Sequence, residues 1–235
     1  AVDLRLPYLA TFVAAAASAT FVLAFRPVGA HGSRVVSVGR LMRAAGRQAA
    51  RSAAVRWVMA LAAFTVVSSH VYYYLQQPYL RAIGTPLALF GVVFAATKMV
   101  TALVASAAHR VDATLGPRTA VAIMATAPAL GLGAMSVVSV PAGAVLILSR
   151  GVLDGLWQPL MNVYMNRLVA SHLRATMLSA QSLVARLTLA AAIALLGVGT
   201  ARAGLPATLA AAALAAAGAG ACLVATARAC RPPVV

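Results

Sequence analysis

The sequence has little charge, and very little negative charge. Charged residues make up 9% of its 235 residues and hydrophobic residues 63%, whereas soluble globular domains are typically about 25% charged. So few polar groups do not cover the apolar ones in water, which argues against a soluble enzyme and against a disordered chain. Together with a mean hydropathy of +0.92, this composition indicates a membrane protein.

Residues for catalysis and metal binding are scarce as well. Glutamate is absent, and the acidic residues are only Asp3, Asp112 and Asp154. Cys222 and Cys230 have neither the spacing nor the partners of a metal site or a disulfide framework, so we interpret them as inert small residues. HExxH, P-loop and GxGxxG motifs are also missing. We therefore expect no enzyme, no metal and no cofactor.

Seven apolar stretches are each long enough to cross a hydrocarbon layer of about 30 Å, which takes about 20 residues. Backbone groups in lipid must be hydrogen-bonded within their own segment, so we expect all seven to be helices. The predicted fold is an all-α polytopic membrane protein with short loops that make most neighbouring helices antiparallel. The predicted spans are residues 6–25, 57–80, 87–108, 119–140, 142–168, 177–200 and 207–227.

The connection between the first two spans, residues 26–56, carries seven arginines and no acidic residue. Four of them recur at steps of three and four, so a helix here has one basic face suited to the anionic inner surface of a membrane. A solvated linker is the alternative. The four arginines are Arg40, Arg43, Arg47 and Arg51.

The basic residues also predict the orientation. If residues 26–56 are cytoplasmic, the loops and tails on that side hold 13 basic residues, and the other side holds three. Basic residues accumulate in cytoplasmic loops, so the N-terminus is expected outside and the C-terminus in the cytoplasm. The arginines lie between apolar runs, so the net charge of +16 does not indicate a nucleic-acid partner. The alanine-rich, lysine-poor composition suggests a bacterial plasma (inner) membrane.

Four charged residues lie well inside predicted spans, away from their ends, namely Lys98, Arg150, Asp154 and Arg186. Each costs ~2.5–3.5 kcal/mol at the centre of a lipid-facing helix, so we expect them to face one another or a wet cavity. Arg150 and Asp154 share a helix face, on which Trp157 continues. This ion pair either fixes helix packing or belongs to a functional site. On an adjoining face, the small-xxx-small pair of Gly151 and Gly155 suits close approach by another helix.

The span 57–80 carries a polar and aromatic stripe, formed by His70, Tyr73, Tyr74 and Gln77 at three- and four-residue steps. One interpretation is a cavity wall whose histidine titrates near neutral pH. The other places the tyrosines in the interfacial aromatic belt, with the histidine bonded to a neighbouring hydroxyl. Prolines inside spans bend their helices, as a gating carrier requires and as ordinary membrane helices also show. These prolines are Pro78, Pro128 and Pro159.

Several short motifs resemble those of bacterial major facilitator superfamily transporters. Residues 75–80 (LQQPYL) and 84–91 (GTPLALFG) resemble the family's seventh and eighth helices, and Arg150-Gly151 with 157–160 (WQPL) also fits. Residues 173–179 (LRATMLS) resemble its link from the tenth helix into the eleventh. The family's cytoplasmic loop signature is degenerate after the third span: it retains Arg110, Leu115-Gly116 and Arg118, and Asp112 lies one position out.

The resemblance implies that residues 1–25 are the last helix of an N-terminal half, 26–56 the central cytoplasmic linker and 57–235 a six-helix C-terminal half. It implies transport of a small solute, by uptake or efflux, through a cavity lined by the second, third, fifth and sixth spans. Asp154 is the one acid within a span, and so the carboxylate for proton coupling. The implied partners are the lipid bilayer, a solute with an anionic group, protons, and a preceding half or a second copy.

Two other functions remain open on the sequence. A chain that holds one half of a carrier is either a working half-carrier or a non-transporting membrane interaction partner, because alternating access takes two halves. A seven-helix receptor is the third hypothesis, but it does not need midspan cations on three helices.

Overall fold

The computed structural model describes residues 12–20 and 38–230, and all regular secondary structure within them is helical, as predicted. The chain divides into two compact units, Ala1–Ser37 and Val38–Val235. In the first unit, residues 12–20 form an exposed helix. The ends of the predicted span 6–25 and residues 26–37 of the predicted linker lie outside the described residues.

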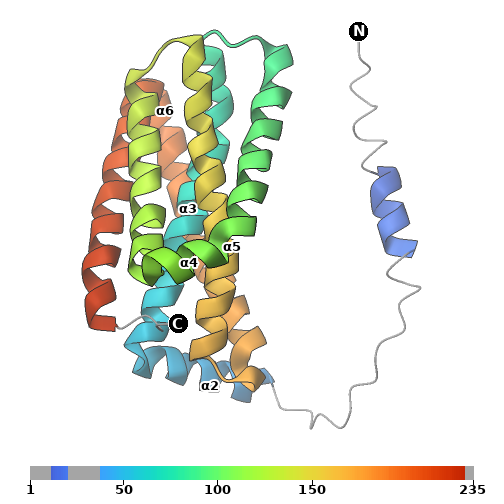
Figure 1. Cartoon of the computed structure of the whole chain (residues 1–235), viewed down its shortest axis with the longest axis vertical. Helices are drawn as coiled ribbons and strands as arrows, with labels where there is room; N and C mark the ends of the chain where they lie inside the picture. Colours follow the sequence, from blue (N-terminus) through green and yellow to red (C-terminus); the bar gives the residue numbers. More distant parts are fainter. Residues whose placement is uncertain (1–11, 21–37, 231–235) are drawn as a thin grey trace. The chain divides into compact units, whose positions relative to one another are not determined.

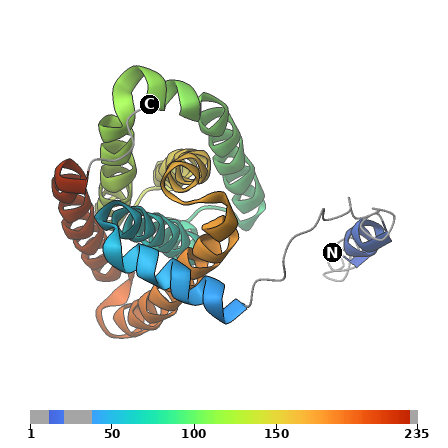
Figure 2. The ribbon, with the colours of Figure 1, turned by 90° about the horizontal axis from the view of Figure 1, so that it is seen from below.

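The second unit is a bundle of helices with one helix across its end (Figures 1 and 2). The crossing helix is α2, and the bundle begins with α3 and α4. A 3-10 helix, η1, leads into α5, which lies between the two arms of α4 in Figure 2. The bounds are Val38–Arg51 for α2, Ala53–Ala82 for α3, Leu87–Val137 for α4, Pro141–Leu148 for η1, Ser149–Leu168 for α5 and Ser171–Cys230 for α6.

Both α4 and α6 bend sharply at a glycine. Gly116 and Gly204 each have a φ of 80°, a left-handed conformation that glycine adopts without strain. The bends divide α4 into arms Leu87–Val111 and Arg118–Val137, and α6 into arms over residues 171–203 and 205–230. A Cβ built on Gly199 would lie 3.1 Å from the hydroxyl of Thr208, so the two arms of α6 pack against each other beside their bend.

Four of the described helical segments are long and apolar enough to cross a membrane: Ala53–Ala82, Leu87–Val111, Arg118–Val137 and Ser171–Ala227. The last of them contains the bend at Gly204. Large apolar side chains are exposed on these helices, among them Leu130 and Leu214, as a surface in contact with lipid requires. These observations are compatible with the predicted membrane location.

The predicted span 142–168 differs from expectation, because the structure divides it between η1 and α5. The 3-10 helix begins at Pro141, and the hydroxyl of Tyr79 occupies the space that a Cβ on Gly143 would need. The segment therefore passes close to α3 before it continues as α5.

At two glycines, α5 packs closely against the first arm of α4. A Cβ on Gly151 would lie 2.7 Å from the carbonyl oxygen of Thr97, and one on Gly155 would lie 2.7 Å from that of Thr101. A methyl group does not fit at these distances, so the two backbones are in direct contact, as the small-xxx-small pattern predicts. This contact places the helix of Lys98 directly beside that of Asp154.

The predicted helix in the basic linker exists as α2, and its apolar side faces the bundle. Ala45 is buried in the core, and Gln48 Nε2 donates to the carbonyl oxygen of Leu168 at 3.2 Å. The apolar side is therefore covered by protein at Ala45, whereas Met42 is exposed. The arginines of the basic face are exposed, and they are Arg40, Arg43, Arg47 and Arg51.

Candidate functional site

Asp154 is the centre of a polar cluster between α3, α4 and α5. Its Oδ1 accepts a hydrogen bond from Ser69 Oγ at 2.5 Å, and its Oδ2 lies 3.3 Å from Arg150 Nη2 and 3.8 Å from Lys98 Nζ. The Asp154 and Arg150 side chains are each 12% exposed, whereas that of Lys98 is 66% exposed. We call Ser69, Gln76, Lys98, Arg150 and Asp154 the Asp154 cluster.

Arg150 connects α5 to α3 through several groups. Its Nε donates to Ser69 Oγ at 3.4 Å, and its Nη1 donates to Gln76 Oε1 at 3.3 Å. The guanidinium carbon lies 5.3 Å from the centre of the Tyr73 ring, in cation–π geometry. With these partners the guanidinium is held in one position, whereas the exposed ammonium of Lys98 has freedom to move.

The Asp154 cluster has a net positive charge. It contains one carboxylate and two cations, and Ser69 and Gln76 are neutral. Asp154 is the only acidic residue whose side chain the structure describes. The cation in excess is the exposed Lys98, because Arg150 and Asp154 form the less exposed pair.

A shallow hollow of about 280 Å³ adjoins the cluster, lined by Tyr73, Tyr74, Gln77, Pro78 and Arg81. Tyr73 connects the hollow to the cluster, because it lines the hollow and its ring also lies against the Arg150 guanidinium. Typical ligand pockets have volumes of about 300–1,000 Å³, so this open hollow lies just below that range.

Three of the four midspan charges singled out in the sequence are brought together: Lys98, Arg150 and Asp154. Arg186 is exposed on the first arm of α6, and its Nε donates to Ser182 Oγ of the same helix at 3.4 Å. Arg186 therefore does not face the other three charges, and the alternative expectation, that it faces a wet cavity, stays a prediction.

The predicted stripe on α3 lies beside the Asp154 cluster and touches it through Tyr73. His70 is exposed, and its Nδ1 lies 2.8 Å from the carbonyl oxygen of Val66 on the same helix. Tyr74 and Gln77 line the hollow. Trp157 is partly buried and packs against the apolar core. Of the residues predicted as cavity wall, Tyr73, Tyr74 and Gln77 thus border the hollow.

Sequence reasoning missed two residues of the cluster, Ser69 and Gln76, which are 5% and 2% exposed. They lie on the face of α3 that adjoins the predicted stripe. With Tyr72 they also follow at three- and four-residue steps, so a second polar stripe was present in the sequence. Tyr72 is fully buried, and its hydroxyl lies 3.1 Å from Ser149 Oγ, directly before Arg150.

Within the part of the chain that the structure describes, no group of three or more His, Cys, Asp or Glu residues is placed to hold a metal ion. Comparison of the chain with protein-family models, curated proteins and solved structures finds no match. Its function therefore has to be inferred from its own residues.

Proposed function

We propose that the chain is part of a secondary transporter of the major facilitator type and moves a small anionic solute together with protons. The observation that carries this proposal is the Asp154 cluster, in which one nearly buried carboxylate is shared between the nearly buried Arg150 and the exposed Lys98. Charged groups inside membrane helices are expensive and mostly functional. Lys98 is eleven residues from the start of its arm, about 16 Å along the helix.

The charges of the cluster suggest how solute and proton are coupled. While Asp154 is ionised, its carboxylate competes with a solute anion for Lys98 and Arg150. When Asp154 is protonated, both cations become available, so protonation and anion binding favour each other. Such linkage is reciprocal, and it leads to movement of proton and anion in the same direction.

The proposal includes a membrane topology. In the second unit, α3, both arms of α4, η1 with α5, and both arms of α6 form the six spans of a C-terminal half. The described basic residues gather at the end of the bundle that carries α2, which we place in the bacterial cytoplasm. These are Arg40, Arg43, Arg47, Arg51, Arg56, Arg110, Arg118, Arg167 and Arg174, whereas Arg81 and Arg202 lie at the opposite end.

Alternating access requires a second bundle that rocks against this one. We propose that it packs near the exposed stripe of α3, where His70, Tyr73 and Tyr74 lie at the surface. An N-terminal half and a second copy of this chain are the two candidates. Without such a partner the chain is a membrane interaction protein that does not transport.

Transport assays with reconstituted protein test the proposal. Proteoliposomes that contain the pH-sensitive dye pyranine are exposed to a panel of mono- and dicarboxylates, phosphate esters and amino acids. We expect at least one anionic solute to cause acidification of the lumen. Asp154→Asn should abolish this proton movement, because the amide does not titrate.

The matched control is Arg186→Gln, which removes a midspan charge outside the cluster and should leave coupled transport nearly unchanged. Full proton coupling in Asp154→Asn would contradict the proposal, and so would the absence of any solute-dependent proton flux from vesicles that hold the chain together with its partner bundle.

A further inference from the structure

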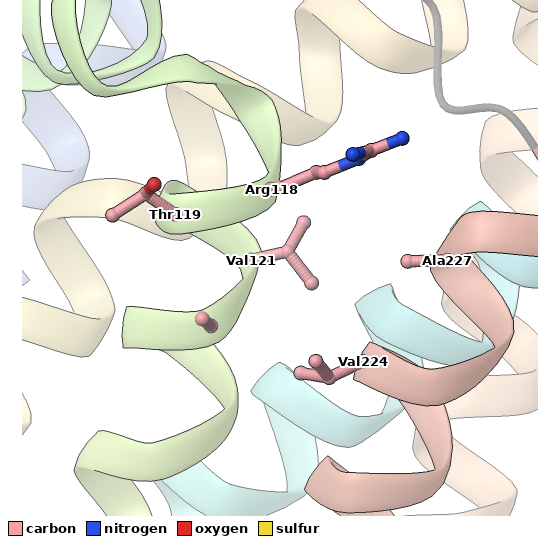
Figure 3. A pocket seen from close by; sticks show the side chains of 6 residues that line it. Arg118, Thr119, Val121, Val224 and Ala227 are labelled. Atoms are coloured by element: carbon pink, nitrogen blue, oxygen red, sulfur yellow. The ribbon is translucent and has the colours of Figure 1, made fainter.

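A second hollow, of about 260 Å³, lies between α4 and α6 (Figure 3). Figure 3 shows Arg118 and Val121 on α4 pointing toward Val224 and Ala227 on α6. Arg118 is the one charged residue among those that line it, and most of the rest of the lining is apolar. We call this hollow the Arg118 groove; its lining residues are Arg118, Thr119, Val121, Ala122, Val224 and Ala227.

The packing of the two helices explains why a groove forms here. The second arms of α4 and α6 touch at Gly220, where a Cβ would lie 2.6 Å from the carbonyl oxygen of Ala125. Arg118 and Ala227 each lie seven residues beyond this contact, about 10 Å along their helices. Over that distance the small side chains of Ala122 and Ala227 leave the space between the arms unfilled.

The groove has a cationic residue, Arg118, at its mouth. Arg118 is exposed, and the ion pairs found among the described residues are those of Asp154, so none of them neutralises Arg118. Arg110 precedes the same bend of α4, and the exposed arginines of α2 lie at the same end of the bundle. The field at the mouth therefore favours an anion.

We propose that the Arg118 groove binds an anionic phospholipid of the cytoplasmic leaflet. The guanidinium would hold the phosphate, since arginine matches phosphate oxygens with two parallel hydrogen bonds. One acyl chain would lie along the partly exposed Ala122 and Val224. A soluble anion makes no use of these apolar walls, and basic pockets between membrane helices are known sites for lipid headgroups. This inference requires a membrane location but not transport activity.

Native mass spectrometry of the full chain released from detergent micelles tests the site. The probes are phosphatidylglycerol and phosphatidylcholine with identical acyl chains. We expect the chain to retain phosphatidylglycerol in preference, and Arg118→Gln to weaken that binding about tenfold. Ala122→Leu, which fills the groove without a change of charge, should weaken it to a similar extent.

Arg40→Gln is the matched control, because it removes the same charge at the same end of the bundle but outside the groove. It should leave retention of phosphatidylglycerol within about twofold of the unmodified chain. Equal losses in Arg40→Gln and Arg118→Gln would show diffuse attraction and overturn the site. Equal retention of the two lipids, unchanged binding in Ala122→Leu, or displacement of the lipid by inorganic phosphate would overturn it as well.

Discussion

At the level of single residues, the ion pair between Arg150 and Asp154 determines whether the cluster contains an unpaired buried charge. Each side chain is nearly buried. Without Asp154, Arg150 would be an uncompensated charge among these helices, whereas Asp154 without Arg150 would keep Lys98 as its cation. Lys98 alone does not replace Arg150, because its Nζ is 3.8 Å from the carboxylate and its side chain is largely exposed. Arg150 also donates hydrogen bonds to Ser69 and Gln76, and no such bond is found for Lys98 among the described residues.

A double-mutant cycle tests this interdependence. Asp154→Leu leaves Arg150 unpaired and should lower the free energy of unfolding by about 3 kcal/mol. Arg150→Met should have a smaller effect, because Asp154 keeps Lys98 and Ser69. The combination Arg150→Met/Asp154→Leu should recover most of the loss, since no buried charge remains. Unfolding of the purified chain in mixed micelles with increasing sodium dodecyl sulfate measures all three. Strictly additive losses in the double variant would show that the two charges do not interact.

At the level of helices, the cluster depends on the contact between α5 and the first arm of α4. The backbone contacts at Gly151 and Gly155 bring Lys98 within reach of Asp154, although the two residues belong to different helices. Any side chain at these glycines would push the two helices apart. The packing of α5 against α4 therefore sets the distance between Lys98 and Asp154.

The variant Gly155→Ala tests this connection. Its methyl group would meet the carbonyl oxygen of Thr101 and the side chain of Val104, each at 2.7 Å, so we expect a loss of stability of about 1–3 kcal/mol. The matched control is Gly197→Ala in α6, where a Cβ has nothing within 4 Å. The control should be neutral or slightly stabilising, because alanine favours a helix over glycine. Thermal unfolding in detergent compares the two, and an equal effect of both substitutions would refute the proposed contact.

How far the sequence predicted these features depends on the kind of signal. The helical secondary structure, the close approach at Gly151 and Gly155, and the pairing of Arg150 with Asp154 all follow from local spacing, and the described residues have each of them. The predicted bounds of the seven spans are matched only in part, because 142–168 is divided between η1 and α5. Local spacing does not say which face of a helix meets its neighbours. For that reason the stripe predicted from the sequence is the one that contains His70 and not the one that contains Ser69 and Gln76.

The same reason applies to Arg186. Its midspan position was evident, but its exposure depends on how the first arm of α6 is rotated against the rest of the bundle. That rotation results from packing between helices far apart in the sequence, which neither periodicity nor composition records.

At the level of the whole bundle, the two hollows lie toward opposite ends. The hollow beside Tyr73 is bordered by Arg81 at the end with few basic residues, and the Arg118 groove lies at the basic end. Between them the Asp154 cluster connects α3, α4 and α5. A transporter of this form needs water at Lys98, because an ammonium group that faced acyl chains would neither exchange protons nor bind solute.

Cysteine accessibility at Lys98 tests this central claim most directly. In membrane vesicles, with Cys222 and Cys230 replaced by serine, Lys98→Cys is compared with Met99→Cys, whose native side chain is equally exposed at 67% but lies one residue further round the helix. The account predicts that the charged reagent 2-sulfonatoethyl methanethiosulfonate modifies Lys98→Cys rapidly and Met99→Cys hardly at all. If neither cysteine reacts, or both react at the same rate, Lys98 does not face a water-filled cavity and the account is contradicted.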